Sequence, residues 1–134
     1  PVDPLAVPAN AVLVPWLSYG QTMPACDLVV SHGGHGTVAR ALSSGCTLVV
    51  CPAAGDMAEN AARVEWAGVG VRLPRRLLGP RTLALAVRRA LGSGAVRARA
   101  GELAAWVAAH DGATAACVEL EAWAARPGRS RGSG

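Results

Sequence analysis

The sequence predicts an α/β fold in which a parallel β-sheet has helices on both faces and further helices follow at the C-terminal end. Short apolar runs rich in β-branched residues alternate with longer segments of helical period. Because the short runs are apolar throughout, they are typical of parallel strands that are buried on both faces. Glycine, proline or aspartate borders each run, which is the composition expected around strands.

The expected elements alternate between strand and helix and end in helices alone. Strands are expected at residues 11–14, 28–30, 48–50 and 69–71. The first helix is expected from Thr37 to Ser44, with Gly45 as the glycine that ends it. Later helices are predicted from apolar residues that recur at intervals of three or four. These stripes are Met57, Ala61 and Val64; Leu83, Val87 and Leu91; Val96, Ala100, Leu103 and Val107; and Cys117, Leu120 and Ala124.

The composition excludes several classes of protein. With 51% apolar residues, most of this 134-residue chain is expected to fold, as one domain. No apolar stretch reaches the ~18 residues of a membrane span, so no integral membrane segment is expected. The net charge is +4, but the arginines are scattered and aromatic residues make up only 4%, so no nucleic-acid binding is expected. Residues 126–134 are expected to form a basic, disordered tail.

The four cysteines predict neither a zinc ribbon nor a redox motif. Cys26, Cys46, Cys51 and Cys117 form no C-x-x-C pair. Two of them flank the apolar run Thr47–Val50, where a free cysteine behaves as a small core residue. We therefore expect buried, reduced thiols and a cytoplasmic location.

Ligands of parallel sheets bind at the carboxyl ends of the strands, so the segments that follow the expected strands form the candidate site. The most informative of them is His32–Thr37. Its three glycines let main-chain N–H groups approach an anion, and the N-terminus of the following helix adds positive charge. With the Thr37 hydroxyl and the His32 ring, this loop predicts a diphosphate site that needs neither lysine nor metal. The alternative is a glycine-rich turn that only reverses the chain.

Two other interpretations of this loop find little support. His-Gly-Gly-x-Gly resembles the oxyanion loop of some esterases, which also need Gly-x-Ser-x-Gly at a strand-to-helix turn. The match to that motif, residues 128–132, lies in the basic tail with no strand before it. His32 and His35 with Cys46 or Cys51 match no zinc-ligand spacing, so no metal is expected.

Three further side chains have both a structural and a ligand-binding interpretation. Asp56, with Glu59 three residues later, has the form of a helix N-cap, yet its second oxygen can accept hydrogen bonds from sugar hydroxyls. Asn60 lies one turn further and can face the same cleft. Trp16 can stack on a nucleobase, although burial in the core is the default expectation for each of the four tryptophans.

These motifs occur in a specific order, and Trp16 precedes His32 by 16 residues. In this order they resemble the donor-binding half of inverting glycosyltransferases with the two-domain GT-B fold, above all bacterial enzymes that glycosylate natural products. The resemblance runs from about Val12 to Leu73. The residues that carry it are Trp16, Asp27–Thr37, Ala41-Leu42, Gly45, Pro52, Gly55-Asp56, Asn60-Ala61 and Gly68–Gly70.

The resemblance implies a Rossmann-like fold, the C-terminal half of a GT-B enzyme. Residues 1–125 would be a donor-binding domain that is truncated at its N-terminal side, since the chain starts at Pro1 and no leader sequence follows. The donor would be a dTDP- or UDP-sugar, and the sugar would pass with inversion to a hydroxyl of a small-molecule acceptor. The acceptor and the general base would belong to an N-terminal domain. We therefore expect no catalytic residue and no cofactor in this chain.

The resemblance also implies a role for individual residues. Trp16 would stack on the base, and Leu17 would offer backbone groups to the base edge. The diphosphate would be held by His32, Gly34, His35, Gly36 and Thr37. The sugar would be bound by Asp56, Met57 and Asn60.

Three positions depart from the pattern of the family. Ser18-Tyr19 stand where the family often has Pro-Gln, and Met57 stands where glutamine is usual. Arg40 replaces a glutamate that binds ribose in many members, and arginine cannot accept those hydrogen bonds. Arg40 would instead pair with a phosphate or point to solvent. Two alternatives stay open: a non-catalytic nucleotide-binding module, and a lipid-linked-intermediate transferase or nucleotide-sugar epimerase of the same fold.

Overall fold

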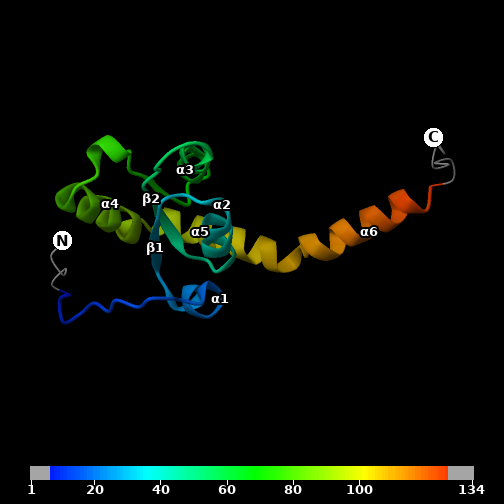
Figure 1. The fold of residues 1–134 in the computed structure, drawn as a ribbon, viewed down its shortest axis with the longest axis horizontal. Coiled ribbons are helices and arrows are strands. Elements are labelled where there is room, and N and C mark those ends of the chain that lie inside the picture. The colour runs from blue at the N-terminus through cyan, green and yellow to red at the C-terminus, as the bar shows by residue number, and fades with distance from the viewer. Residues whose placement is uncertain (1–6, 127–134) are drawn as a thin grey trace.

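The computed structural model describes residues 7–126, and its centre is a three-stranded parallel sheet (Figure 1). The predicted α/β fold with a parallel sheet is confirmed. Pro1 and most of the expected basic tail, including residues 128–132, lie outside the described residues. The strands lie in the order β1 (Leu28–Ser31), β2 (Thr47–Val50) and β3 (Gly70–Arg72).

Helices connect the strands and continue after them. The helix α2 starts two residues before the expected Thr37, and Gly45 follows it with φ +76°, as predicted for the glycine that ends a helix. The α-helices are α1 (Tyr19–Thr22), α2 (His35–Ser43), α3 (Asp56–Trp66), α4 (Pro80–Gly92), α5 (Gly94–Ala109) and α6 (Gly112–Ala124). Two short 3-10 helices complete the described elements, η1 (Met23–Ala25) and η2 (Arg75–Leu77).

Alternate side chains of β2 pack into two hydrophobic clusters, one on each face of the sheet. Leu48 and Val50 are fully buried in the cluster that includes α2 and α3. Val49 points the other way, into the cluster formed with α4. In the parallel register Val29 of β1 lies opposite Leu48, and Gly70 of β3 lies on its other side. Both faces of β2 are therefore covered, as its unbroken apolar run predicts.

The expected strand at residues 11–14 is wrong. The side chains of Val12, Leu13 and Val14 are more than half exposed, and Val12 reaches 83%. The backbone hydrogen bond from Ala11 N to the Pro8 carbonyl closes a turn and joins no strand. A strand forms only where a neighbouring strand exchanges hydrogen bonds with it. In doubly wound sheets, two strands that follow one another in the sequence need not be neighbours in the sheet. The position of residues 11–14 before β1 therefore does not imply that they pair with β1.

The default burial of the tryptophans is also wrong. Trp66 is 90% exposed and Trp16 is 77% exposed, and Trp106 and Trp123 are more than half exposed as well. The apolar stripe on α6 packs on nothing in the described fold, because this helix projects away from the sheet with every residue exposed (Figure 1). Among residues 7–126, no helix combines the length and apolar character that crossing a bilayer requires.

Candidate functional site

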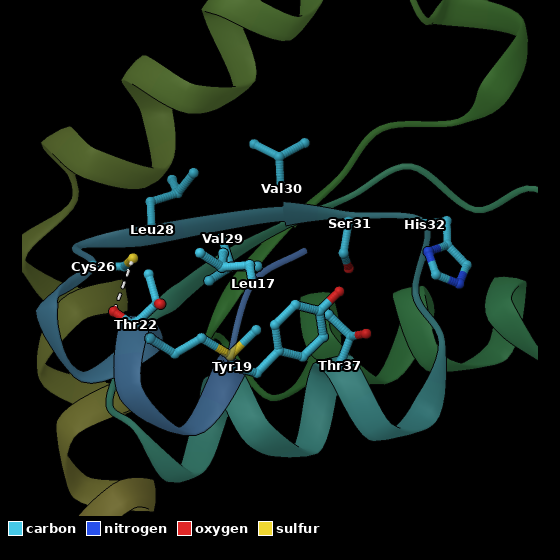
Figure 2. Close-up of a pocket in the computed structure, with 11 residues that line it drawn as sticks. Leu17, Tyr19, Thr22, Cys26, Leu28, Val29, Val30, Ser31, His32 and Thr37 are labelled. Carbon is cyan, nitrogen blue, oxygen red and sulfur yellow. Dashed lines mark hydrogen bonds between the residues drawn. The ribbon is translucent and has the colours of Figure 1, made fainter. Parts of the chain in front are cut away.

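A pocket of about 360 Å³ lies beside β1 and reaches its carboxyl end (Figure 2). Ser31, His32 and Thr37 form its polar end. Leu17 and Tyr19 approach it from the segment that precedes β1, so two segments singled out in the sequence meet in one pocket. The other lining residues are Thr22, Met23, Cys26, Leu28, Val29 and Val30.

The loop between β1 and α2 is held in place by contacts that only glycine permits at position 33. Gly33 has φ +91°, and a Cβ there would lie 2.8 Å from Val50 Cγ1 and 3.1 Å from the Met57 carbonyl oxygen. The Asn60 side-chain amide donates to the Gly33 carbonyl oxygen at 3.0 Å. The loop is therefore fixed between β2 and the first turns of α3.

The N-terminus of α2 has main-chain N–H groups that are open to an anion. Its N-cap is Gly34, which has no side chain to accept from the first turn. The first internal hydrogen bond runs from Val38 N to the Gly34 carbonyl at 3.0 Å. Within residues 7–126, the preceding N–H groups of His35, Gly36 and Thr37 have no acceptor. Unsatisfied N–H groups and the helix dipole together attract anions.

The His32 ring lies directly over this helix N-terminus. A Cβ on Gly34 would lie 2.8 Å from His32 Nε2, and its three nearest heavy atoms would all belong to that ring. Any residue can adopt the backbone conformation of Gly34, with φ −60° and ψ 136°. Glycine matters at this position because a side chain would contact the imidazole. A larger residue at position 34 would have to displace the His32 ring from its place over the open N–H groups.

Tyr19 and Ser31 have hydroxyl groups at the polar end of the pocket but are missing from the site predicted from the sequence. The Ser31 Oγ accepts from Gly33 N at 3.2 Å and so helps to fix the loop. Figure 2 shows the Tyr19 hydroxyl directed toward Ser31 and Thr37. Ser31 follows an apolar run directly, which is a signal that could have identified it. Tyr19 stood out only as a departure from the family pattern.

The predicted capping role of Asp56 is wrong by one residue. Gly55 is the N-cap of α3, with φ +59° and ψ −135°, a conformation open only to glycine, and Asp56 is the first helical residue. The Asp56 carboxylate is exposed and makes no hydrogen bond with other residues in the described part of the chain. It is therefore available to a ligand, next to the second turn that contacts Gly33.

The side chains of His35 and Arg40 lie elsewhere. His35 lines a separate groove of about 270 Å³ between α2 and α3, together with Asn60 and Arg63. Arg40 lines a groove between α2 and α5. Neither His35 nor Arg40 lines the pocket of His32 and Thr37. His35 therefore contributes only its main-chain N–H group to the open helix terminus.

Trp16 and Leu17 form an adjoining surface. With residues 14–19 they line an open hollow of about 710 Å³, in which the Trp16 ring is largely exposed. Leu17 and Tyr19 line both this hollow and the pocket beside β1. An extended ligand could therefore contact the Trp16 face at one end and the His32 loop at the other.

The cysteines contribute no reactive centre to this pocket. All four thiols are free; Cys46 is buried, Cys26 and Cys51 are half-buried, and Cys117 is exposed, which corrects the expectation that all are buried. Burial raises the pKa of Cys46 and of Cys51, with Cys26 and Asp27 adding to the effect at Cys46. Residues 7–126 contain no group of three or more His, Cys, Asp or Glu that could hold a metal ion.

A family comparison identifies this arrangement. The family described as "Erythromycin biosynthesis protein CIII-like, C-terminal domain" matches residues 3–122. The chain belongs to this family. Among curated proteins it is 38% identical over 120 residues to O-mycaminosyltylonolide 6-deoxyallosyltransferase of Streptomyces fradiae, covering 89% of the chain and 28% of that enzyme. It is 37% identical over 111 residues to 4'-demethylrebeccamycin synthase of Lentzea aerocolonigenes, covering 83% of the chain and 26% of that enzyme.

Solved structures support the same assignment. The calicheamicin glycosyltransferase CalG4 superposes with a TM-score of 0.83 at 28% identity, over 92% of the chain and 32% of that structure. The glycosyltransferase VinC in complex with dTDP superposes with a TM-score of 0.70 at 25% identity, over 74% of the chain and 25% of that structure. The predicted resemblance to the C-terminal domain of GT-B glycosyltransferases is confirmed. The chain spans little more than a quarter of the length of these curated relatives.

Proposed function

We propose that this chain binds the nucleotide-sugar donor of an inverting glycosyltransferase. The whole enzyme would move a sugar from a dTDP- or UDP-sugar to a hydroxyl of a small-molecule acceptor. The observation that carries this proposal is the α2 N-terminus, where three unsatisfied N–H groups lie beneath the His32 ring at the end of the pocket. The name of one relative, a 6-deoxyallosyltransferase, and the dTDP bound to VinC support it.

The diphosphate would occupy the polar end of the pocket. The N–H groups of the first turn of α2, the His32 ring and the Thr37 hydroxyl would all donate hydrogen bonds to it. Negative charge builds up on the diphosphate as the bond to the sugar breaks, and fixed donors with a helix dipole stabilise that charge without reorganising. The part of this chain in the reaction is thus to stabilise the leaving group, while the attacking hydroxyl is activated from another domain.

The base and the sugar would lie on opposite sides of the diphosphate. The exposed Trp16 ring offers a flat face for stacking, with the Leu17 backbone at the base edge. On the other side, Asp56 offers an unengaged carboxylate to the sugar hydroxyls. Asn60 retains its amide oxygen for the sugar, since its NH₂ group donates to Gly33. Met57, half-buried beside the loop, would give the sugar an apolar contact.

The remaining partners belong to the rest of the enzyme. We propose that the acceptor and the general base lie in an N-terminal domain, that no further cofactor takes part, and that the enzyme works in the cytoplasm. The alternatives of a binding module, a lipid-linked-intermediate transferase or an epimerase are favoured by no observation on the site.

Calorimetric titration of the chain with dTDP, UDP and GDP tests the proposal. We expect saturable binding of a pyrimidine nucleotide that is tighter than binding of GDP. His32→Ala should weaken it by about 1.5–3 kcal/mol, the worth of a hydrogen bond to a charged group. Asp56→Ala should leave dTDP binding intact and reduce the preference for a dTDP-sugar over dTDP. Absence of saturable nucleotide binding, or full affinity in His32→Ala, would contradict the proposal.

A further inference from the structure

Tyr19 is a hydroxyl-bearing residue in the donor pocket to which the family resemblance assigns no role. It stands where the family often has glutamine, and it is the first residue of the short helix α1. Its side chain lines the same pocket as Ser31, His32 and Thr37. Figure 2 shows the ring extending from α1 beneath β1, with its hydroxyl directed toward Ser31 and Thr37 at the polar end.

The Tyr19 hydroxyl has an unused hydrogen-bonding capacity at that place. Within residues 7–126 it forms no hydrogen bond. The Ser31 Oγ is already an acceptor for Gly33 N, so its own proton is free to point into the pocket. The Thr37 hydroxyl also has no partner in the described chain. Three hydroxyl groups and the His32 ring thus converge on one volume without satisfying one another.

The charge of the pocket indicates what these donors bind. Its lining residues include neither a carboxylate nor an arginine, so an anion entering it meets neutral donors and the positive end of α2. Hydrogen bonds from neutral donors to a charged acceptor are worth more than those between neutral groups. A phenol is a stronger donor than an aliphatic hydroxyl because it is the more acidic of the two. The oxygen atoms of a phosphate are the acceptors that fit this set.

We infer that the Tyr19 hydroxyl donates a hydrogen bond to a phosphate oxygen of the nucleoside diphosphate, beside Thr37. This inference rests on the proposed function and adds a binding residue to it. The Tyr19 ring also forms part of the apolar wall next to Leu17, and that contribution is independent of the hydroxyl. The two contributions can be separated, because phenylalanine retains the ring and removes only the oxygen.

The test compares dTDP with thymidine as ligands of the parent chain and of Tyr19→Phe. Loss of one hydrogen bond to a charged group should weaken dTDP binding about tenfold or more, and thymidine, which has no phosphate, should bind both proteins equally. Ser43→Ala is the matched control, because it removes one hydroxyl from the other end of α2, where Ser43 donates to the Arg40 carbonyl. This control should bind dTDP like the parent.

The outcomes separate the inference from the proposed function. Equal dTDP affinity in the parent and in Tyr19→Phe, with weaker binding in His32→Ala, would overturn the role of Tyr19 and leave the proposed function intact. A parallel loss of dTDP and thymidine affinity would assign Tyr19 to the structural wall and also overturn the inference. If the parent itself bound no dTDP, the proposed function and the inference would both be wrong. A loss confined to dTDP supports both.

Discussion

Replacing Gly34 by alanine tests whether the position of the His32 ring governs donor binding. The new Cβ would lie 2.8 Å from His32 Nε2, closer than unstrained contacts allow, and the ring is the nearest group that could move. The backbone at φ −60° and ψ 136° accepts alanine without strain. The substitution therefore acts on the imidazole while the fold around it stays in place.

The expected magnitudes differ between folding and binding. Alanine loses up to about 1 kcal/mol relative to glycine at an N-cap but gains about 0.4–1 kcal/mol by restricting the unfolded chain, so unfolding free energy should change by less than about 1 kcal/mol. Moving the ring would forfeit the proposed hydrogen bond from His32 to the diphosphate, worth about 1.5–3 kcal/mol. The Kd for dTDP should rise about ten- to a hundredfold.

The assay is calorimetric titration with dTDP on Gly34→Ala, His32→Ala and the double variant, with melting curves for each. Because the Cβ acts through the ring, the double variant should bind no more weakly than His32→Ala alone. Gly101→Ala on α5 is the control: a Cβ there has no heavy atom within 4 Å, so it should stabilise the helix and leave binding unchanged. Parent-like binding by Gly34→Ala, or additive losses in the double variant, would refute this explanation.

Three further predictions concern stability and reactivity. Gly33→Ala should lower the unfolding free energy by about 2–4 kcal/mol in denaturant titration, because it combines φ +91° with a Cβ 2.8 Å from Val50 Cγ1; a parent-like midpoint would contradict this. Hydrogen bonds from Thr114 and Ala113 lower the pKa of Asp111, so the cap of α6 should be intact above about pH 4 and lost as the pH falls below it. Circular dichroism should show this acid loss in the parent and not in Asp111→Asn. Iodoacetamide should label the exposed Cys117 well before Cys46, whose buried thiol has a raised pKa, and equal rates would show that Cys46 is accessible.

The parts of the fold that the sequence predicts correctly are those with local or two-sided signals. The run at residues 48–50 is apolar because both of its faces are covered. A central strand needs apolar side chains on both faces regardless of which strands lie beside it. Gly45 ends a helix through its own φ value. The run at 11–14 carries the same local signal as a strand, but pairing depends on which strand lies beside it. Strand neighbours are a property of topology, which composition does not encode.

In the candidate site, too, the structural features with a local sequence signal are predicted correctly and the others are not. The open N–H groups that suit the loop to bind an anion follow from glycines before a helix, which is a local pattern. The divergence of His32 and His35 does not follow from it, because the two side chains lie on either side of a loop-to-helix transition whose dihedral angles set their directions. The Asp56 cap fails for a related reason. Gly55 adopts a conformation that only glycine reaches, and the helix begins one residue earlier than the capping pattern indicates.

Asn60 links the loop between β1 and α2, the proposed diphosphate site, to α3, the proposed sugar site, and this link changes what its substitution would mean. Its side-chain amide donates to the Gly33 carbonyl at 3.0 Å, and the same glycine packs against the Met57 backbone. A pure sugar contact at Asn60 would affect a dTDP-sugar and leave dTDP alone. Because the hydrogen bond fixes the loop, Asn60→Ala should instead weaken dTDP and dTDP-sugar together, by about 1–3 kcal/mol for the buried carbonyl left unpaired. A loss seen only with the dTDP-sugar would mean that the loop keeps its shape without α3 and that the sequence-based role of Asn60 is sufficient.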